Sequence, residues 1–154
     1  MKRKSRASVS PLDSHIGFWM RLLSNHVSGR FRQAIEASGS TVAEWVALRQ
    51  LYECGNTTHA ELMVLLGMTK GAVSKVVTRL ELKGLASRGA DTARRGQVIS
   101  LTEAGRRLVP ELARLADEND AVFFGHLTVK ERDLLMGLLQ RIAKLHGISG
   151  VAVE

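Results

Sequence analysis

Residues 58–82 read THAELMVLLGMTKGAVSKVVTRLEL, which is typical of a short helix, a tight turn and a second helix. Thr58 and Glu61 have the spacing of a capping box, so the short helix is expected to begin there. Gly67 is suited to end that helix, and Thr69 can cap the helix that follows. The stretch therefore predicts a helix-turn-helix.

The second helix of this stretch has two different faces. One is an apolar stripe at helical spacing, expected to pack on the body of the protein: Val73, Val76, Val77 and Leu80. The other carries small residues, hydroxyls and cations, and no acid: Thr69, Lys70, Gly71, Ser74, Lys75, Thr78 and Arg79. Such a face suits the DNA major groove, because small residues allow close approach and cations reach guanine or phosphate. A solvated helix face is the alternative, and Glu81 and Lys83 are expected to be solvated.

After Gly84 the pattern changes from helical to alternating. Residues 85–88 and 97–101 are short stretches with alternating apolar positions, joined by a basic, turn-rich link. We expect a β-hairpin with Arg94 and Arg95 at its tip, where long cations can enter the DNA minor groove. An ordinary polar turn is the alternative. Arg88 is expected either to brace the hairpin or to contact phosphate.

Helices are also predicted on the N-terminal side. Apolar residues three and four apart indicate a helix over about residues 13–37, which Gly39 ends. Thr41 and Glu44 form a capping box for the next helix, which Gly55 closes. The residues expected on the buried face of that helix are Trp45, Leu48, Leu51 and Tyr52.

Two further helices are predicted after the hairpin. Thr102 caps a long one, and Pro110 within it should kink the helix or delay its regular start. Its inward residues are expected to be Leu108, Leu112, Leu115, Ala116, Val122 and Phe123. Thr128 and Glu131 form a capping box for the last helix. The residues that it is expected to bury are Leu134, Leu135, Leu138, Leu139, Ile142 and Leu145. The predicted fold class is mainly α with a small β-hairpin, six helices in a single domain.

The positive charge is concentrated in two places. The chain of 154 residues has 22 Lys and Arg against 15 Asp and Glu, a formal net charge of +7. Residues 1–10 contribute +4 and residues 69–107 contribute +6, whereas the rest is slightly acidic. This asymmetry favours a polyanionic partner, most often nucleic acid. The segment 1–10 is expected to be a flexible basic arm that adds phosphate affinity, or else a disordered solubilising tail.

Several other classes of protein are disfavoured. No apolar run approaches the ~18–20 residues of a membrane span, and no secretory signal is recognisable, so a cytoplasmic location is expected. The five histidines are scattered without metal-ligand spacing, and the sequence has no Gly-rich phosphate loop or GxSxG elbow. No metal, cofactor or catalytic site is therefore predicted. Cys54 stands alone, and a buried structural thiol is expected there.

The run from Gly67 to Leu85, followed by Arg94-Arg95-Gly96 and by LTEAG at 101–105, resembles the multiple antibiotic resistance regulator (MarR) family. The resemblance extends over nearly the whole chain. It implies a winged helix-turn-helix homodimer acting on a palindromic operator, often released by a small aromatic acid or an oxidant. The family's wing usually has Asp two residues before the arginine that matches Arg95. Here that position is Ala93, and Asp91 is expected to brace the arginine instead.

The expected organisation is a basic arm over 1–10 and a single winged-helix domain over 11–154. Within the domain, 11–38 and 108–154 are expected to be dimerisation helices and 41–107 the DNA-binding lobe. The apolar stripes near both chain ends favour a dimer independently, because two chains can bury them against each other. Two recognition helices would then meet successive major grooves about 34 Å apart.

The favoured function is a sequence-specific transcriptional regulator of double-stranded DNA, with repression favoured and activation as the alternative. A small aromatic or anionic effector is expected in a pocket beside the DNA-binding lobe, and candidate lining residues are Trp19, His26, Arg30 and Trp45. For the two tryptophans, simple core packing is the favoured alternative. A DNA-coating architectural protein without sequence preference is the alternative function. An enzyme is disfavoured because no catalytic constellation is visible.

Overall fold

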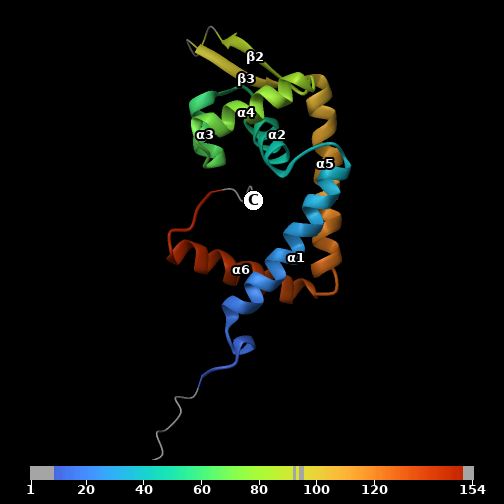
Figure 1. The fold of residues 1–154 in the computed structure, drawn as a ribbon, viewed down its shortest axis with the longest axis vertical. Helices are drawn as coiled ribbons and strands as arrows, with labels where there is room; N and C mark the ends of the chain where they lie inside the picture. Colours follow the sequence, from blue (N-terminus) through green and yellow to red (C-terminus); the bar gives the residue numbers. More distant parts are fainter. Residues whose placement is uncertain (1–8, 92, 94–95, 151–154) are drawn as a thin grey trace, which may run out of the picture.

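The computed structural model describes residues 9–91, 93 and 96–150. Within them the chain forms six α-helices and a small antiparallel sheet, which confirms the predicted fold class. The elements in chain order are η1 (Leu12–Ser14), α1 (Ile16–Ala37), α2 (Val42–Cys54), β1 (Thr57–Thr58), α3 (His59–Leu66), α4 (Lys70–Leu82), β2 (Ala86–Asp91), β3 (Gly96–Leu101), α5 (Glu103–Phe124) and α6 (Val129–Leu145). Figure 1 shows α2, α3, α4 and the sheet gathered at one end, whereas α1 and α6 lie toward the other.

Threonine hydroxyls begin five of these helices, as the sequence predicts. The capping boxes of α2, α3 and α6 are complete, since each hydroxyl accepts the backbone N–H three residues on and each glutamate accepts the cap N–H. At α6 the backbone N–H and the hydroxyl of Thr128 both donate to Glu131, and these hydrogen bonds lower the pKa of that carboxyl group. Local sequence signals therefore set the helix starts.

The start of α5 follows the same rule. The hydroxyl of Thr102 accepts the N–H of Gly105 at 3.1 Å, and the helix begins at Glu103. It continues as one element past Pro110. The expected delay of the helix start is therefore wrong. Pro110 lies beyond the capped first turn, so it removes one backbone N–H donor without disturbing the turn from which the helix starts.

The sheet has three strands in the order β1-β3-β2. In the hairpin, Ala86 pairs with Leu101 and Asp91 pairs with Gly96, so β2 extends three residues nearer the tip than the predicted 85–88. Strand β1 pairs Thr57 with Ile99 and was not predicted. Two residues are too few to show an alternating pattern, and their sequence reads equally well as a helix cap.

The hydrophobic core lies where α2, α3, α4, the sheet and the first half of α5 meet. Its largest fully buried apolar side chains are Ile35, Leu48, Leu51, Leu62, Leu66, Leu80, Ile99, Leu112, Val73 and Val77. The predicted apolar stripe of α4 is buried in full, which fixes the direction of its opposite face. Gly105 in the first turn of α5 packs directly on the backbone of Leu85, so the connection between α4 and β2 lies directly against the start of α5.

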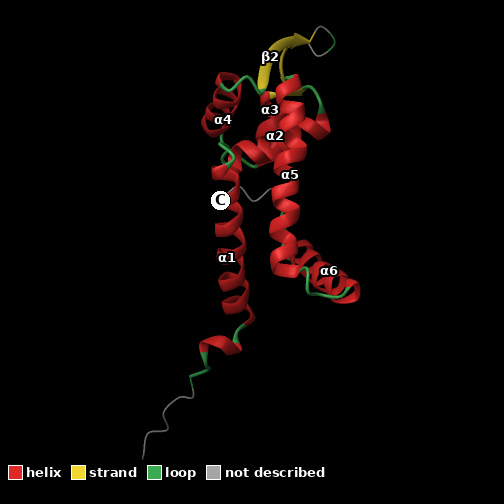
Figure 2. Ribbon diagram, turned by 90° about the vertical axis from the view of Figure 1, so that its right-hand side faces the viewer, coloured by secondary structure: helices red, strands yellow, loops and turns green. Residues whose placement is uncertain are grey.

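Helix α1 runs beside α5 in both views (Figures 1 and 2). Asn119, which is 4% exposed, joins the two helices. Its Nδ2 donates to the carbonyl oxygen of Val27 at 3.2 Å, and its Oδ1 accepts from Arg30 at 3.1 Å. A buried amide with both ends hydrogen-bonded holds the helices in one register.

Several residues expected to be buried are exposed in the single chain. On α6 all the predicted inward residues are at least 38% exposed, namely Leu134, Leu135, Leu138, Leu139, Ile142 and Leu145. Tyr52 on α2 and Val122 on α5 are also exposed, at 44% and 57%. The expected burial is wrong for Tyr52. Val122 and the α6 stripe belong to the segment expected to pair with a second chain, and one chain alone leaves them exposed.

Candidate nucleic-acid interface

Helix α4 presents a polar face to solvent over a buried apolar face. Thr69 caps it by accepting the N–H of Ala72 at 3.3 Å. Of the predicted contact residues, Ser74 is half-buried and the others are exposed: Thr69, Lys70, Gly71, Lys75, Thr78 and Arg79. Ser74, Lys75, Thr78 and Arg79 together line a shallow depression. The structure thus brings the predicted residues together on one accessible surface.

A longer groove lies between α4, the start of α3 and the hairpin. It is lined by His59, Ala60, Met63, Lys70, Ser74, Thr78, Arg88 and Gln97. His59 and Gln97 were not predicted as site residues. Each reaches the groove only because the fold brings the first residue of α3 and a residue of β3 beside α4, and no local motif marks them.

The wing is joined to the recognition helix by an ion pair. Arg88 on β2 contacts the carboxylate of Glu81 near the end of α4, and both side chains are about a quarter exposed, at 26% and 27%. Arg88 therefore braces the hairpin, which is one of its two predicted roles. The expectation that Glu81 is merely solvated is wrong, because β2 folds back over the last turn of α4.

Asp91, the last residue of β2, makes one described contact beside the hairpin turn. Its Oδ1 accepts the N–H of Ala93 at 2.9 Å, a local turn that the side chain of an aspartate commonly makes. The side chain of Asp91 thus accepts a hydrogen bond from the backbone of Ala93, the residue that stands where the family usually has aspartate. The predicted wing residues Arg94 and Arg95 lie outside the described residues, as does most of the predicted basic arm.

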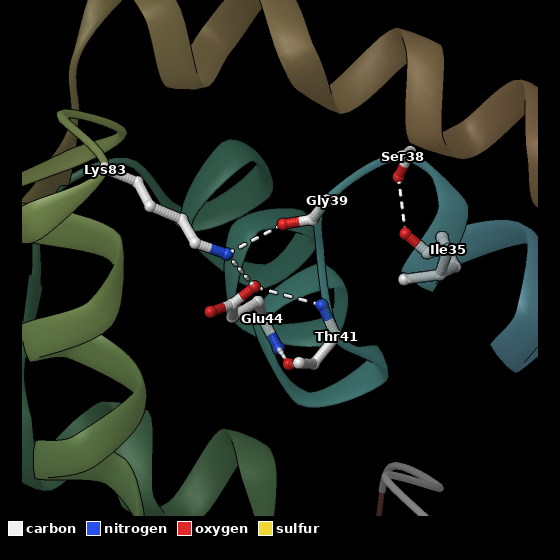
Figure 3. Close-up of polar contacts among 6 residues, drawn as sticks. All are labelled: Ile35, Ser38, Gly39, Thr41, Glu44 and Lys83. Atoms are coloured by element: carbon white, nitrogen blue, oxygen red, sulfur yellow. Dashed lines mark hydrogen bonds and ion pairs between the residues drawn. The ribbon is translucent and has the colours of Figure 1, made fainter.

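Lys83, which follows α4, was also expected to be solvated. Instead its Nζ lies 2.7 Å from Oε2 of Glu44 and 2.8 Å from the carbonyl oxygen of Gly39 (Figure 3). The expectation is wrong because the chain between α1 and α2 passes close to the end of α4. That contact joins residues 39 positions apart, and no sequence pattern predicts it.

The four predicted ligand-binding residues do not form one site. Trp19 is 48% exposed and donates from Nε1 to the carbonyl oxygen of Asp13 at 2.8 Å. His26 is exposed, and Arg30 bonds Asn119. Only Trp45 lines the cavity that the structure shows between α1, α2 and α5.

That cavity has a volume of about 280 Å³ and a mostly apolar wall. Its lining residues are Val27, Ser28, Phe31, Arg32, Val42, Trp45, Val46, Ala116, Asn119 and Asp120. The cation in it is Arg32 rather than Arg30, because positions two apart on α1 point to different sides of the helix. Asp120 is ion-paired with Arg132 of α6. The cavity therefore offers an aromatic wall and a guanidinium to an anionic ligand.

Cys54 is the last residue of α2 and is exposed. The expected buried thiol is wrong, because α2 ends at Gly55 with the Cys54 side chain on its outer surface. Among residues 9–91, 93 and 96–150, no helix is both long and apolar enough to cross a membrane.

The chain matches the family model described as "MarR family" over residues 38–96. A probable transcriptional regulator from Pseudomonas aeruginosa, known from a crystal structure, is 34% identical, with a TM-score of 0.71 over 86% of this chain and 99% of that one. The chain belongs to the MarR family of transcriptional regulators. The fold described above is accordingly a winged helix-turn-helix, in which α4 is the recognition helix and the hairpin β2–β3 is the wing.

Two further relatives of this MarR-family regulator have informative names. The HTH-type transcriptional repressor NicR of Pseudomonas putida is 25% identical, over 92% of this chain and 95% of the relative. BpsR of Bordetella bronchiseptica, whose DNA binding is regulated by 6-hydroxynicotinic acid, is 26% identical, with a TM-score of 0.74 over 88% of this chain and 98% of that one. NicR is thus named as a transcriptional repressor, and BpsR as a DNA-binding protein that responds to 6-hydroxynicotinic acid.

Proposed function

We propose that this MarR-family protein is a homodimeric, sequence-specific repressor that binds a palindromic operator. The observation that carries the proposal is the exposed polar face of α4, where every predicted contact residue is accessible above a fully buried apolar face. A rigid helix with hydroxyls and cations on its free side reads base edges in the major groove. The name of the relative NicR supports repression rather than activation.

The dimer is proposed from the exposed apolar residues of α1 and α6. The large exposed ones are Ile16, Phe18, Trp19, Met20, Leu22 and Leu23 on α1, and Val129, Leu134, Leu135, Met136, Leu138, Leu139, Ile142 and Leu145 on α6. Apolar surface of this extent on two helices is unusual for a monomer. Interleaving segments 11–38 and 108–154 of two chains removes it from water, and it leaves the lobe 41–107 of each chain free for DNA.

Within that dimer the recognition helix supplies contacts from Thr69, Lys70, Gly71, Ser74, Lys75, Thr78 and Arg79. The wing supplies contacts from Arg88, Arg94 and Arg95 to the adjacent minor groove or backbone. Because Arg88 is held by Glu81, it approaches DNA from a fixed position. The positive charge of both elements favours the phosphate backbone.

Selection of bound fragments from random double-stranded DNA tests the function directly. We expect a palindrome whose half-sites are about one helical turn apart. Competition against random DNA at physiological salt then separates a regulator from an architectural protein, because a regulator retains a preference of about 1,000-fold or more. Recovery of no common sequence, with equal affinity for all fragments, would instead establish the architectural alternative.

Replacing Lys75 by methionine tests the orientation of α4. Lys75 is exposed on the proposed DNA face, and the methionine keeps the apolar stem while removing the charge. If Lys75 neutralises one phosphate in each subunit, operator affinity falls, and the slope of log K against log salt becomes shallower by about 1 for each lost contact. Binding is measured by fluorescence anisotropy at several salt concentrations. The matched control is Lys130→Met on α6, which removes the same charge away from the DNA face and leaves the slope unchanged.

A small aromatic acid is the proposed effector, held in the cavity between α1, α2 and α5. Trp45 provides an aromatic wall, and Arg32 provides a cation for the carboxylate. The regulation of BpsR by 6-hydroxynicotinic acid makes that compound a suitable probe for this chain. A ligand that fits only one arrangement of α1, α2 and α5 shifts the dimer toward that arrangement and changes its DNA affinity.

The probe experiment compares two neighbouring arginines. We expect 6-hydroxynicotinate to quench tryptophan fluorescence, and Arg32→Gln to weaken this binding about tenfold or more, since a charge-assisted hydrogen bond is lost. Arg30→Gln, at a residue that does not line the cavity although it donates to the lining residue Asn119, is expected to change binding much less. A loss confined to Arg30→Gln would show that the cavity assignment is wrong.

A further inference from the structure

The carboxylate of Glu44 lies at the junction of three segments of the DNA-binding lobe (Figure 3). Glu44 is 1% exposed, and its Oε2 accepts the backbone N–H of Thr41 at 2.9 Å. The same oxygen lies 2.7 Å from Nζ of Lys83, which also donates to the carbonyl oxygen of Gly39 at 2.8 Å. The ammonium group therefore holds both the α1–α2 connection and the first turn of α2.

A buried carboxylate of this kind depends on its partners. Removing a carboxylate from water costs several kcal/mol, which is offset only where hydrogen bonds and an opposite charge are well placed. Two of the partners are local, since the N–H of Thr41 and the helix N-terminus belong to the capping box of α2. Lys83 is the distant one, and its side chain is only 39% exposed although lysines usually extend into solvent.

The Lys83–Glu44 ion pair bears on α4 because of where Lys83 lies in the chain. Lys83 is the residue directly after α4, so its ion pair ties the C-terminal end of the recognition helix to the start of α2. The apolar face of α4 is held by packing, which is weakly directional. Among the residues that the structure describes, the charged contacts of the last turn of α4 and the residue after it are the Lys83–Glu44 and Arg88–Glu81 pairs. Of these two, the Lys83–Glu44 pair is the one that reaches the helical core.

We propose that the Lys83–Glu44 pair is a positioning device that sets the orientation of the recognition helix for operator binding. The proposal rests on the DNA-binding role of α4 stated above. Lys83 acts through α4 and does not neutralise a phosphate, because its ammonium group is engaged by Glu44 and Gly39. Side chains that read bases must be held within about 0.5 Å of the productive geometry, so a small tilt of α4 reduces specific binding more than non-specific binding.

The test uses Glu44→Gln and Lys83→Met in the full chain. A glutamine at position 44 still accepts the N–H of Thr41, so the capping box survives while the charge is lost. We expect each variant to weaken binding to the selected operator by about tenfold, typical of residues that modulate a site without touching its ligand. Affinity for random DNA and the salt slope stay unchanged. Thermal unfolding checks that each variant is folded. If Glu44→Gln does not fold, the test rests on Lys83→Met, which alters the partly exposed end of the pair.

The sign of the Glu44→Gln effect separates positioning from simple electrostatics. Removing an acid near a polyanion strengthens DNA binding if charge alone acts, whereas a misplaced recognition helix weakens it. The double variant is expected to be no weaker than either single one, because both remove the same contact. Tighter operator binding by Glu44→Gln, additive losses in the double variant, or a shallower salt slope in Lys83→Met would each overturn the proposal.

Two controls keep the outcomes distinct. Arg49→Met breaks an exposed ion pair with Glu53 within α2 and removes one charge from the same lobe, and we expect operator binding within about twofold of the unchanged protein because exposed pairs contribute little. Lys75→Met tests the DNA face itself. If Lys75→Met has no effect, the proposed function fails. If Lys75→Met weakens binding but Lys83→Met and Glu44→Gln do not, only the positioning role fails.

Discussion

Replacing Gly105 by alanine destabilises the protein by about 3 kcal/mol or more, an exceptional cost for adding one methyl group. A Cβ atom at this position would overlap the carbonyl oxygen of Leu85 and lie 3.0 Å from its carbonyl carbon. It would also lie 3.3 Å from Cδ2 of Leu101. The free energy of unfolding, measured by urea denaturation without DNA, checks this expectation.

The obstacle at Gly105 is backbone, which cannot rotate away as a side chain can. The carbonyl oxygen of Leu85 accepts the N–H of Thr102 at 3.1 Å, the residue that caps α5. Moving the carbonyl therefore breaks a hydrogen bond at the junction of the recognition helix, the sheet and α5. A single small residue allows these three elements to meet.

The matched control is Gly71→Ala in the first turn of α4. A Cβ there has no atom within 4 Å, and the helical conformation suits alanine. We expect this change to raise the free energy of unfolding by about 0.5 kcal/mol, since alanine loses less conformational entropy. Equal effects of the two substitutions would show that the contact between Gly105 and Leu85 does not constrain the fold.

The features that the sequence predicted well are those encoded within one turn of helix. Thr41, Thr58 and Thr128 each stand three residues before a glutamate, and each cap forms without help from distant residues. The two faces of α4 follow from helical periodicity in the same way. Because most of the candidate contact residues lie on this one helix, most of the proposed interface could be predicted from local sequence.

Contacts between distant segments were not visible in this way. Lys83 looks like an ordinary surface residue in the sequence and Glu44 like a local helix cap, and their pairing depends on how α2 and α4 are placed. His59 and Gln97 join the groove for the same reason. Glycine 105 is a further case, since nothing in its neighbours along the chain distinguishes a close approach from a flexible position.

The apolar stripes of α1 and α6 show a third limit. Their periodicity predicted helices correctly, and the single chain leaves these stripes exposed, whereas the cover expected for them is a second chain. A pattern of apolar residues indicates that a helix face is buried in the functional molecule. It does not indicate whether the same chain or a second chain buries it. The cover has to be identified by an experiment on the oligomeric state.

Replacing Leu138 by glutamate supplies that experiment. Leu138 lies on the α6 stripe with Leu134, Ile142 and Leu145, and it is already 38% exposed in the single chain, so the charge can be solvated in a monomer. In the proposed dimer the same carboxylate is buried without a partner in each subunit, at a cost of several kcal/mol per charge. We expect a monomer by sedimentation at micromolar concentration, with the helical content retained.

Operator binding is expected to fall by about a hundredfold or more, because a monomer presents one recognition helix and loses the gain from simultaneous binding to two half-sites. The control is Val64→Glu on α3, which places the same charge at a position that is 82% exposed and lies outside α1 and α6. That variant is expected to remain a dimer. A dimeric Leu138→Glu protein with normal operator affinity would show that α6 faces solvent in the functional molecule, and the exposed residues of α1 would then need a different partner.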